Sequence, residues 1–152
     1  MPVRRLNHAV LYVSDAQRAA AFYRDALGME VAADLGQAVF MSLPASDAHH
    51  DLGLFTVGGS ERPGRTGPGL YHLAWEVERF EDLVERRARL LDLGALSGES
   101  DHGASLSLYA SDPDGIEFEV CWQLPPEEWP DGVTTRRLDW RAATERWAGR
   151  PD

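Results

Sequence analysis

The sequence predicts an α+β fold in which a βαβββ unit occurs twice, over about residues 4–57 and 70–122. Each unit opens with a strand of alternating side chains, and a helix with apolar residues on one face follows it. His8 and His72 begin the equivalent opening strands of the two units. We expect the units to form one strongly curved, eight-stranded mixed sheet, with the helices on its convex face and a cleft on its concave face.

The first unit contains four predicted strands and one helix. Ser14 and Asp15 supply an N-cap for the helix, and Gly28 suits the left-handed conformation that commonly follows a helix end. The predicted elements are strands at 6–13, 29–34, 38–43 and 52–57 and a helix at 16–27.

The second unit repeats this order. Asp112-Pro113-Asp114-Gly115 has the composition of a tight turn, because proline presets φ, aspartate bonds to nearby backbone and glycine accepts positive φ. We therefore expect a β-hairpin around it. The predicted elements are strands at 70–77, 95–100, 104–110 and 116–122 and a helix at 80–93.

We expect residues 1–122 to form a single domain, and 123–152 to be a C-terminal extension. Residues 58–69 are rich in glycine and proline, which is typical of a linker. In the extension, 125–130 is too proline-rich for regular structure, whereas 138–148 has the pattern of a short helix. The extension could cap the cleft or lie in a dimer interface, although aromatic packing without a catalytic role is the more common meaning of its tryptophans.

Composition narrows the range of partners. The net charge of −10 and the pI near 4.9 argue against nucleic acid or an anionic membrane surface, because phosphates would be repelled. All basic residues are arginine, which excludes a lysine Schiff base. Cys121 is the single cysteine, so we expect a small buried thiol in a cytoplasmic protein. No apolar run approaches the roughly 20 residues of a membrane span.

Candidate metal ligands occur in both units. Alternation along the last strand places Glu117 and Glu119 on the face opposite its apolar residues. His8 and His72 project into the same predicted cleft. Two imidazoles and one carboxylate on one face can hold a divalent ion and leave coordination positions open. The alternation alone leaves both glutamates as candidates.

The duplicated pattern, with His8, His72 and Glu119, resembles the vicinal-oxygen-chelate superfamily over about residues 1–122. That group includes glyoxalase I, bleomycin- and fosfomycin-resistance proteins and extradiol ring-cleaving dioxygenases. The segment that begins two residues before His102 is similar to the signature of extradiol enzymes. It departs from that signature at Ser100, where Gly, Asn, Thr or an aliphatic residue is usual. The pieces most similar to small catechol 2,3-dioxygenase-like members are His49-His50-Asp51-Leu52, Gly69-Leu70-Tyr71-His72, and Asp101-His102-Gly103 through Leu108-Tyr109 and Asp112-Pro113-Asp114-Gly115 to Glu119.

The resemblance implies a role for each of these residues. His8, His72 and Glu119 would be the metal ligands, because the family places its carboxylate four residues after the turn glycine. His102 matches the family's acid–base residue, and Tyr109 matches a tyrosine that can hydrogen-bond a substrate oxygen.

The activity that the resemblance implies is extradiol-type opening of a catechol-like ring by O₂ at a non-haem Fe(II) site. Mn(II), Ni(II) and Zn(II) are alternative metals for two histidines and a glutamate. The implied partners are a small aromatic diol and O₂, and we expect a homodimer.

Two other kinds of function remain open. A redox-neutral metalloenzyme of the same superfamily could be an isomerase, a lyase or a thiol transferase. Against a glyoxalase I-type site, the strand at 51–57 offers no interior carboxylate as a fourth ligand. A metal-free resistance protein that sequesters a cationic antibiotic would suit the negative charge, but it would not need the three candidate ligands. His49 and His50 could line the pocket entrance or form a turn, and we assign them no chemistry.

Overall fold

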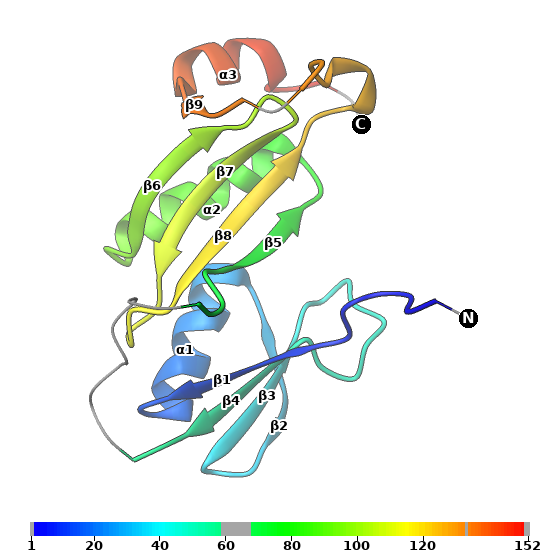
Figure 1. Cartoon of the computed structure of the whole chain (residues 1–152). Helices are drawn as coiled ribbons and strands as arrows, with labels where there is room; N and C mark the ends of the chain where they lie inside the picture. The colour runs from blue at the N-terminus through cyan, green and yellow to red at the C-terminus, as the bar shows by residue number, and fades with distance from the viewer. Residues whose placement is uncertain (1, 59–67, 133, 151–152) are drawn as a thin grey trace. The chain divides into compact units, whose positions relative to one another are not determined.

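The βαβββ order occurs twice along the chain, as the sequence predicts (Figure 1). The strands and helices fall into two units. Unit 1 contains the described residues up to Gly58 together with Asp112–Asp114, and unit 2 contains Pro68–Ser111 and the described residues from Gly115 onward. The computed structural model describes residues 2–58, 68–132 and 134–150.

Unit 1 contains a four-stranded mixed sheet with the order β1-β4-β3-β2. β1 and β4 are parallel, and the other neighbours are antiparallel. The N-cap Asp15 accepts hydrogen bonds from the backbone of Gln17 and Arg18, and the helix ends at Gly28 with φ of 73°, as predicted. The elements are β1 (Ala9–Val13), α1 (Ala16–Leu27), β2 (Glu30–Asp34), β3 (Ala38–Ser42) and β4 (Leu52–Thr56).

Unit 2 contains a five-stranded sheet with the order β5-β8-β7-β6-β9. β5 and β8 are parallel, and the other neighbours are antiparallel. Helix α2 contacts β8, β5 and β6. The elements are β5 (Leu73–Val77), α2 (Phe80–Asp92), β6 (Leu96–Asp101), β7 (Ser105–Ser111), β8 (Glu117–Gln123), the 3₁₀ turn η1 (Pro126–Glu128), β9 (Arg136–Arg137) and α3 (Trp140–Trp147).

Burial alternates along β1, and along β8 from Glu117 to Val120, in the way the sequence predicts. On β8, Phe118 and Val120 are each 1% exposed, and they lie on the face that α2 covers. On β1, Leu11 and Val13 are buried, whereas Tyr12 between them is 73% exposed. Because successive side chains point to opposite faces, Glu117 and Glu119 are left on the face of β8 away from the helix.

The predicted hairpin joins β7 and β8, and its turn makes hydrogen bonds within unit 1. Gly115 has φ of 73°, and the backbone N–H of Asp114 donates to the Asp112 carboxylate. The Ser14 hydroxyl donates to Asp114 at 2.6 Å, and the buried Tyr23 hydroxyl donates to Asp112 at 3.1 Å. The turn aspartates are therefore hydrogen-bonded to the residue that follows β1 and to the middle of α1.

Several boundaries differ from the predicted ones. β1 and β5 begin one residue after His8 and His72, so both histidines lie just before their strands. The prediction that 125–130 lacks regular structure was wrong at Pro126–Glu128, which form a 3₁₀ turn. Proline is tolerated in a first turn, because the N–H that it lacks would be unpaired there. The strand β9 was not predicted, since two arginines carry no strand pattern.

The α+β class and the two βαβββ units are confirmed. That the two sheets join into a single eight-stranded sheet with a cleft stays a prediction. The boundary between the domain and the C-terminal extension at residue 122 also stays a prediction. Most of the predicted linker at 58–69 lies outside the described residues. Among the helices of the described ranges, none combines the length and the apolar character that a membrane crossing requires.

Candidate functional site

Strand register in unit 2 gathers the candidate residues on one face of its sheet. Glu119 on β8 pairs with Ala74 on β5 and with Tyr109 on β7. His72 precedes β5 by one residue, two positions before Ala74, so it lies on the same face. We call this surface, with His72, Tyr109, Glu117 and Glu119, the carboxylate face.

His72 lies between two carboxylates. Its Nε2 atom is 3.0 Å from Oε2 of Glu119, and its Nδ1 atom is 3.7 Å from Oε1 of Glu117. The three side chains are 12–21% exposed, so they are partly screened from solvent. Within the described residues, Nδ1 of His72 is buried and has no hydrogen-bond partner.

The contact between His72 and Glu119 has the length of an ion pair or hydrogen bond, and the same length fits two adjacent ligands of one metal ion. Metal bonds of about 2.0–2.2 Å at about 90° place two ligand atoms about 3 Å apart. The described residues contain no group of three or more His, Cys, Asp or Glu side chains arranged to hold a metal. The structure therefore brings together two of the three predicted ligands, and the complete set stays a prediction.

His8, the third predicted ligand, belongs to unit 1. It is exposed, and its Nδ1 atom is 2.8 Å from Oδ1 of Asn7. That contact leaves Nε2 as the nitrogen that could bind a metal. The ring centroids of His8 and His50 lie 4.7 Å apart, and Nδ1 of His50 is 3.1 Å from Nδ1 of His49. Burial and the charges of the other two imidazoles lower the pKa of His50.

The two predicted catalytic residues are in direct contact. Nε2 of His102 is 2.8 Å from the hydroxyl of Tyr109, and the Tyr109 ring also packs against His72 with centroids 5.6 Å apart. Burial, followed by the charge of Glu119, raises the pKa of Tyr109 to about 12. Tyr109 is therefore protonated at neutral pH and able to donate a hydrogen bond.

Thr135 is a contact that the sequence analysis missed. Its Oγ1 atom lies 3.0 Å from Nδ1 of His102, on the opposite side of the ring from Tyr109. The C-terminal extension reaches this point because β9 pairs with β6, and Arg136 forms an ion pair with Asp101 at 2.9 Å. No motif could have indicated Thr135, since it lies 33 residues from His102 in an irregular segment.

Cys121 is a small buried thiol, as expected. It is 7% exposed, and burial raises its pKa to about 11, with Glu119 adding to the shift. A thiol with this pKa is not an activated nucleophile at neutral pH.

Comparison with known proteins gives the wider context for this geometry. Residues 5–120 match the profile of the Glyoxalase/Bleomycin resistance protein/Dioxygenase superfamily. The chain is 32% identical to biphenyl-2,3-diol 1,2-dioxygenase 3 of Rhodococcus globerulus, over 84% of this chain and 68% of that protein. It is 34% identical to the ethylmalonyl-CoA/methylmalonyl-CoA epimerase of Cereibacter sphaeroides, over 78% of this chain and 97% of that protein.

Other matched dioxygenases are longer, and this chain spans 40–43% of the length of four of them. Among solved structures, the fold is similar to that of lactoylglutathione lyase from Agrobacterium tumefaciens, with a TM-score of 0.61 and 27% identity. That similarity covers 80% of this chain and 96% of the lyase.

Proposed function

Because this chain belongs to the glyoxalase/bleomycin resistance protein/dioxygenase superfamily, we propose that it is a metal-dependent dioxygenase that opens a catechol-like ring with O₂. The observation that supports this most is the contact between His72 and Glu119, next to a tyrosine that is hydrogen-bonded to His102. Those four side chains match the ligand and acid–base positions of extradiol enzymes. The 32% identity to a biphenyl-diol dioxygenase supports the same activity.

We propose that His8, His72 and Glu119 hold the ion, with Fe(II) as the first choice and Mn(II), Ni(II) or Zn(II) as alternatives. When bound, a redox-active ion would supply a path for electrons from the substrate to O₂. Two neutral imidazoles and one carboxylate leave a divalent ion with a net positive charge, which attracts a catecholate. Glu117, beside His72, would orient its imidazole through Nδ1.

The proposed role of His102 is to transfer a proton at Nε2. In the tautomer with its proton on Nε2, His102 accepts from the Thr135 hydroxyl at Nδ1 and donates to the Tyr109 oxygen. Tyr109 retains its proton at neutral pH, and that proton is then free to hydrogen-bond a substrate oxygen. The substrate would be a small aromatic diol, and we propose a cytoplasmic homodimer.

A redox-neutral reaction is the second candidate. The epimerase relative is matched over 97% of its length, which makes it similar in size to this chain, unlike the longer dioxygenases. A fourth ligand from unit 1, as in glyoxalase I, is not supported within the described residues. Asp51 precedes β4, and its carboxylate accepts hydrogen bonds from the Leu43 backbone and the Ser46 hydroxyl. Its role is to hold the loop before β4.

Oxygen uptake distinguishes the two candidates. Protein loaded anaerobically with Fe(II) should consume O₂ when catechol, 3-methylcatechol or 2,3-dihydroxybiphenyl is added, and a yellow ring-opened semialdehyde should form. Bound metal without oxygen uptake across this panel would overturn the dioxygenase and favour the redox-neutral reaction.

A matched pair of variants tests the ligand assignment. Glu119→Gln should lose bound metal and lower activity by more than about 100-fold, because a first ligand matters more than its supporting groups. Glu117→Gln makes the same change two residues away and should retain about one metal per chain. Metal loss in Glu117→Gln, with retention in Glu119→Gln, would show that the ligand has been assigned to the wrong glutamate.

A further inference from the structure

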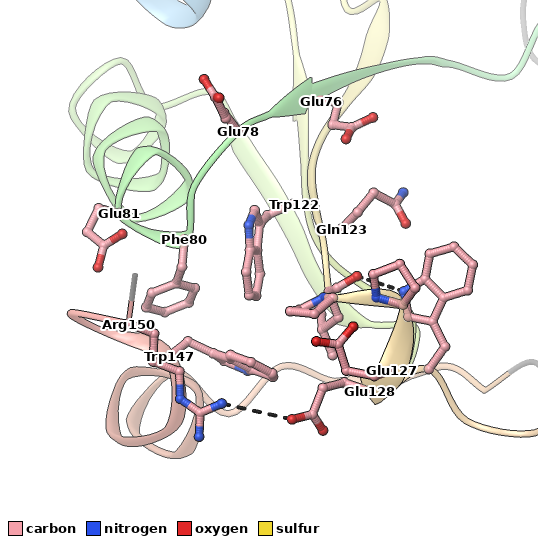
Figure 2. Close-up of a pocket in the computed structure, with 14 residues that line it drawn as sticks. Glu76, Glu78, Phe80, Glu81, Trp122, Gln123, Glu127, Glu128, Trp147 and Arg150 are labelled. Carbon is pink, nitrogen blue, oxygen red and sulfur yellow. Dashed lines mark hydrogen bonds and ion pairs between the residues drawn. The ribbon is translucent and has the colours of Figure 1, made fainter. Parts of the chain in front are cut away.

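Unit 2 contains a cavity that the proposed reaction does not use. It has a volume of about 620 Å³ and lies between the end of β5, the start of α2, the turn η1 and the helix α3 (Figure 2). Glu76 on its wall is four residues beyond His72, so about 13 Å of extended β5 separates the two. The volume is in the range of pockets that hold small organic ligands, which is about 300–1,000 Å³.

Aromatic rings form the rigid part of this cavity. Trp122 packs edge-to-face against Phe80, with centroids 5.6 Å apart, and against Trp147, with centroids 5.2 Å apart. All three are at most 9% exposed, so this wall is fixed by the core. Trp129 is 50% exposed, and its ring is held by a 2.7 Å hydrogen bond from Nε1 to the Leu124 carbonyl.

The polar part of the cavity is strongly acidic. Five glutamates line it, with Arg150 as the cationic lining residue. Glu81 accepts a hydrogen bond from the Gly149 backbone, and Glu128 pairs with Arg146. The other three, Glu76, Glu78 and Glu127, form no ion pair within the described residues. Figure 2 shows Glu76 and Glu78 above Trp122, with Glu127 across the cavity from them.

The wall of the cavity already binds a cation supplied by the chain itself. The guanidinium carbon of Arg150 lies 4.9 Å from the centroid of the Trp147 ring, and its Nη1 atom is 3.9 Å from Glu128. The guanidinium of Arg146 lies over the same ring at 4.6 Å. The Trp147 face, with the Glu128 carboxylate beside it, therefore already holds a cation here.

We propose that this cavity binds an organic cation that carries an aromatic or aliphatic body. Glu76, Glu78 and Glu127, which line the cavity, would attract the ammonium or amidinium group by their charge, and the apolar body would pack against Trp122 and Trp129. Anionic ligands are disfavoured, because five glutamates line the space. This site is independent of the proposed ring-opening reaction.

The test uses two probes that differ in charge and have nearly the same shape. 2-Phenylethylamine, which is protonated at pH 7, should bind the full chain with a Kd below about 1 mM in calorimetry. 2-Phenylethanol should bind at least about tenfold more weakly. Saturable shifts of tryptophan indole N–H signals in an NMR titration would report on the ring wall. Equal affinity for the two probes, or no saturation up to about 10 mM amine, would overturn the proposal.

Two double variants with the same change in net charge locate the site. Glu78→Gln with Glu127→Gln should weaken amine binding by about tenfold or more. Glu30→Gln with Glu85→Gln should not change it, since Glu30 is exposed on β2 and Glu85 is 70% exposed on α2, outside the cavity. Equal weakening in both pairs would mean that the amine senses only the overall negative charge, and would also overturn the site.

Discussion

The first four strands of each unit have the same order, but the units differ at the residue paired two positions after the candidate histidine. In unit 2, the strand parallel to β5 places Glu119 beside Ala74, two residues after His72. In unit 1, the strand parallel to β1 places Gly53 beside Val10, two residues after His8. Gly53 is therefore the structural counterpart of Glu119.

In unit 1, apolar side chains fill the space beside this position. A Cβ atom at Gly53 would lie 3.3 Å from both the Phe55 ring and the Val10 side chain, and 3.6 Å from the Phe40 ring. A side chain there would need Phe55 and Val10 to move. The duplicated backbone thus presents an imidazole twice and a carboxylate once, which is the ligand composition of the proposed site.

The largest expected effect tests whether the two histidines are equivalent. His8→Ala and His72→Ala should each lose bound metal and lower oxygen uptake by more than about 100-fold, because each removes one proposed ligand. His49→Ala is the control, since His49 also contacts the His50 ring but is not a proposed ligand. If His8→Ala keeps its metal while His72→Ala loses it, only unit 2 supplies ligands and the comparison fails.

Proton transfer is expected to depend on unit 2. His102→Ala should retain the metal but lower kcat by about 10²–10³-fold, as for other general acids and bases. Thr135→Val should lower kcat by about tenfold and shift the pH profile, while KM stays close to that of the unchanged protein, because the Nδ1 partner that fixes the imidazole is lost.

Thr135→Ser retains the hydroxyl and should restore the profile. Thr134→Val is the matched control, because the Thr134 methyl group packs near Gly103 and is kept in valine. A pH profile that Thr135→Val leaves unchanged would show that the contact does not orient His102.

A smaller effect is expected at Gly53. Gly53→Ala should lower the free energy of unfolding by about 1 kcal/mol, since overpacking in a filled site costs about 1–3 kcal/mol and a methyl group is the smallest addition. Gly58→Ala is the control, because a Cβ there meets nothing within 4 Å. Urea unfolding measures the free energy of unfolding of both variants. A neutral or stabilising Gly53→Ala would show that unit 1 has room at this position.

The smallest effect concerns alkaline pH. In the folded protein the pKa of Cys121 is raised to about 11 from 9.0, so the unfolded chain loses this proton first. Stability should therefore fall as pH rises from about 9 toward 11. Cys121→Ala should flatten this dependence in urea midpoints measured between about pH 8 and pH 10. An identical slope in both proteins would contradict the burial of the thiol.

The sequence was sufficient to predict the structure where local conformational preferences determine it. Asp15, Gly28 and the Asp-Pro-Asp-Gly turn have strong conformational preferences, and each adopts the predicted role. The face assignments of β8 were also correct, because alternation in a half-buried strand depends only on the pleat.

The parts that could not be predicted depend on long-range contacts. Strand β9 is defined by its pairing with β6, and its two arginines have no strand preference of their own. The same pairing brings Thr135 to His102. The hydrogen bonds that Asp112 and Asp114 accept from Tyr23 and Ser14 were also not predicted. Aspartates are common in tight turns, so their presence in the sequence did not indicate a distant partner.

The register of β8 links the proposed chemistry to the folding of the core. Since Phe118 and Val120 lie under α2 while Glu119 between them lies beside Tyr109, one extra residue inserted ahead of Phe118 would exchange the two faces. Carboxylates would then enter the apolar interior, and phenylalanine and valine would replace the ligand. An insertion or deletion of one codon in this short strand would therefore disturb the core and the proposed site together, unless a bulge such as those in β2 and β6 absorbs it.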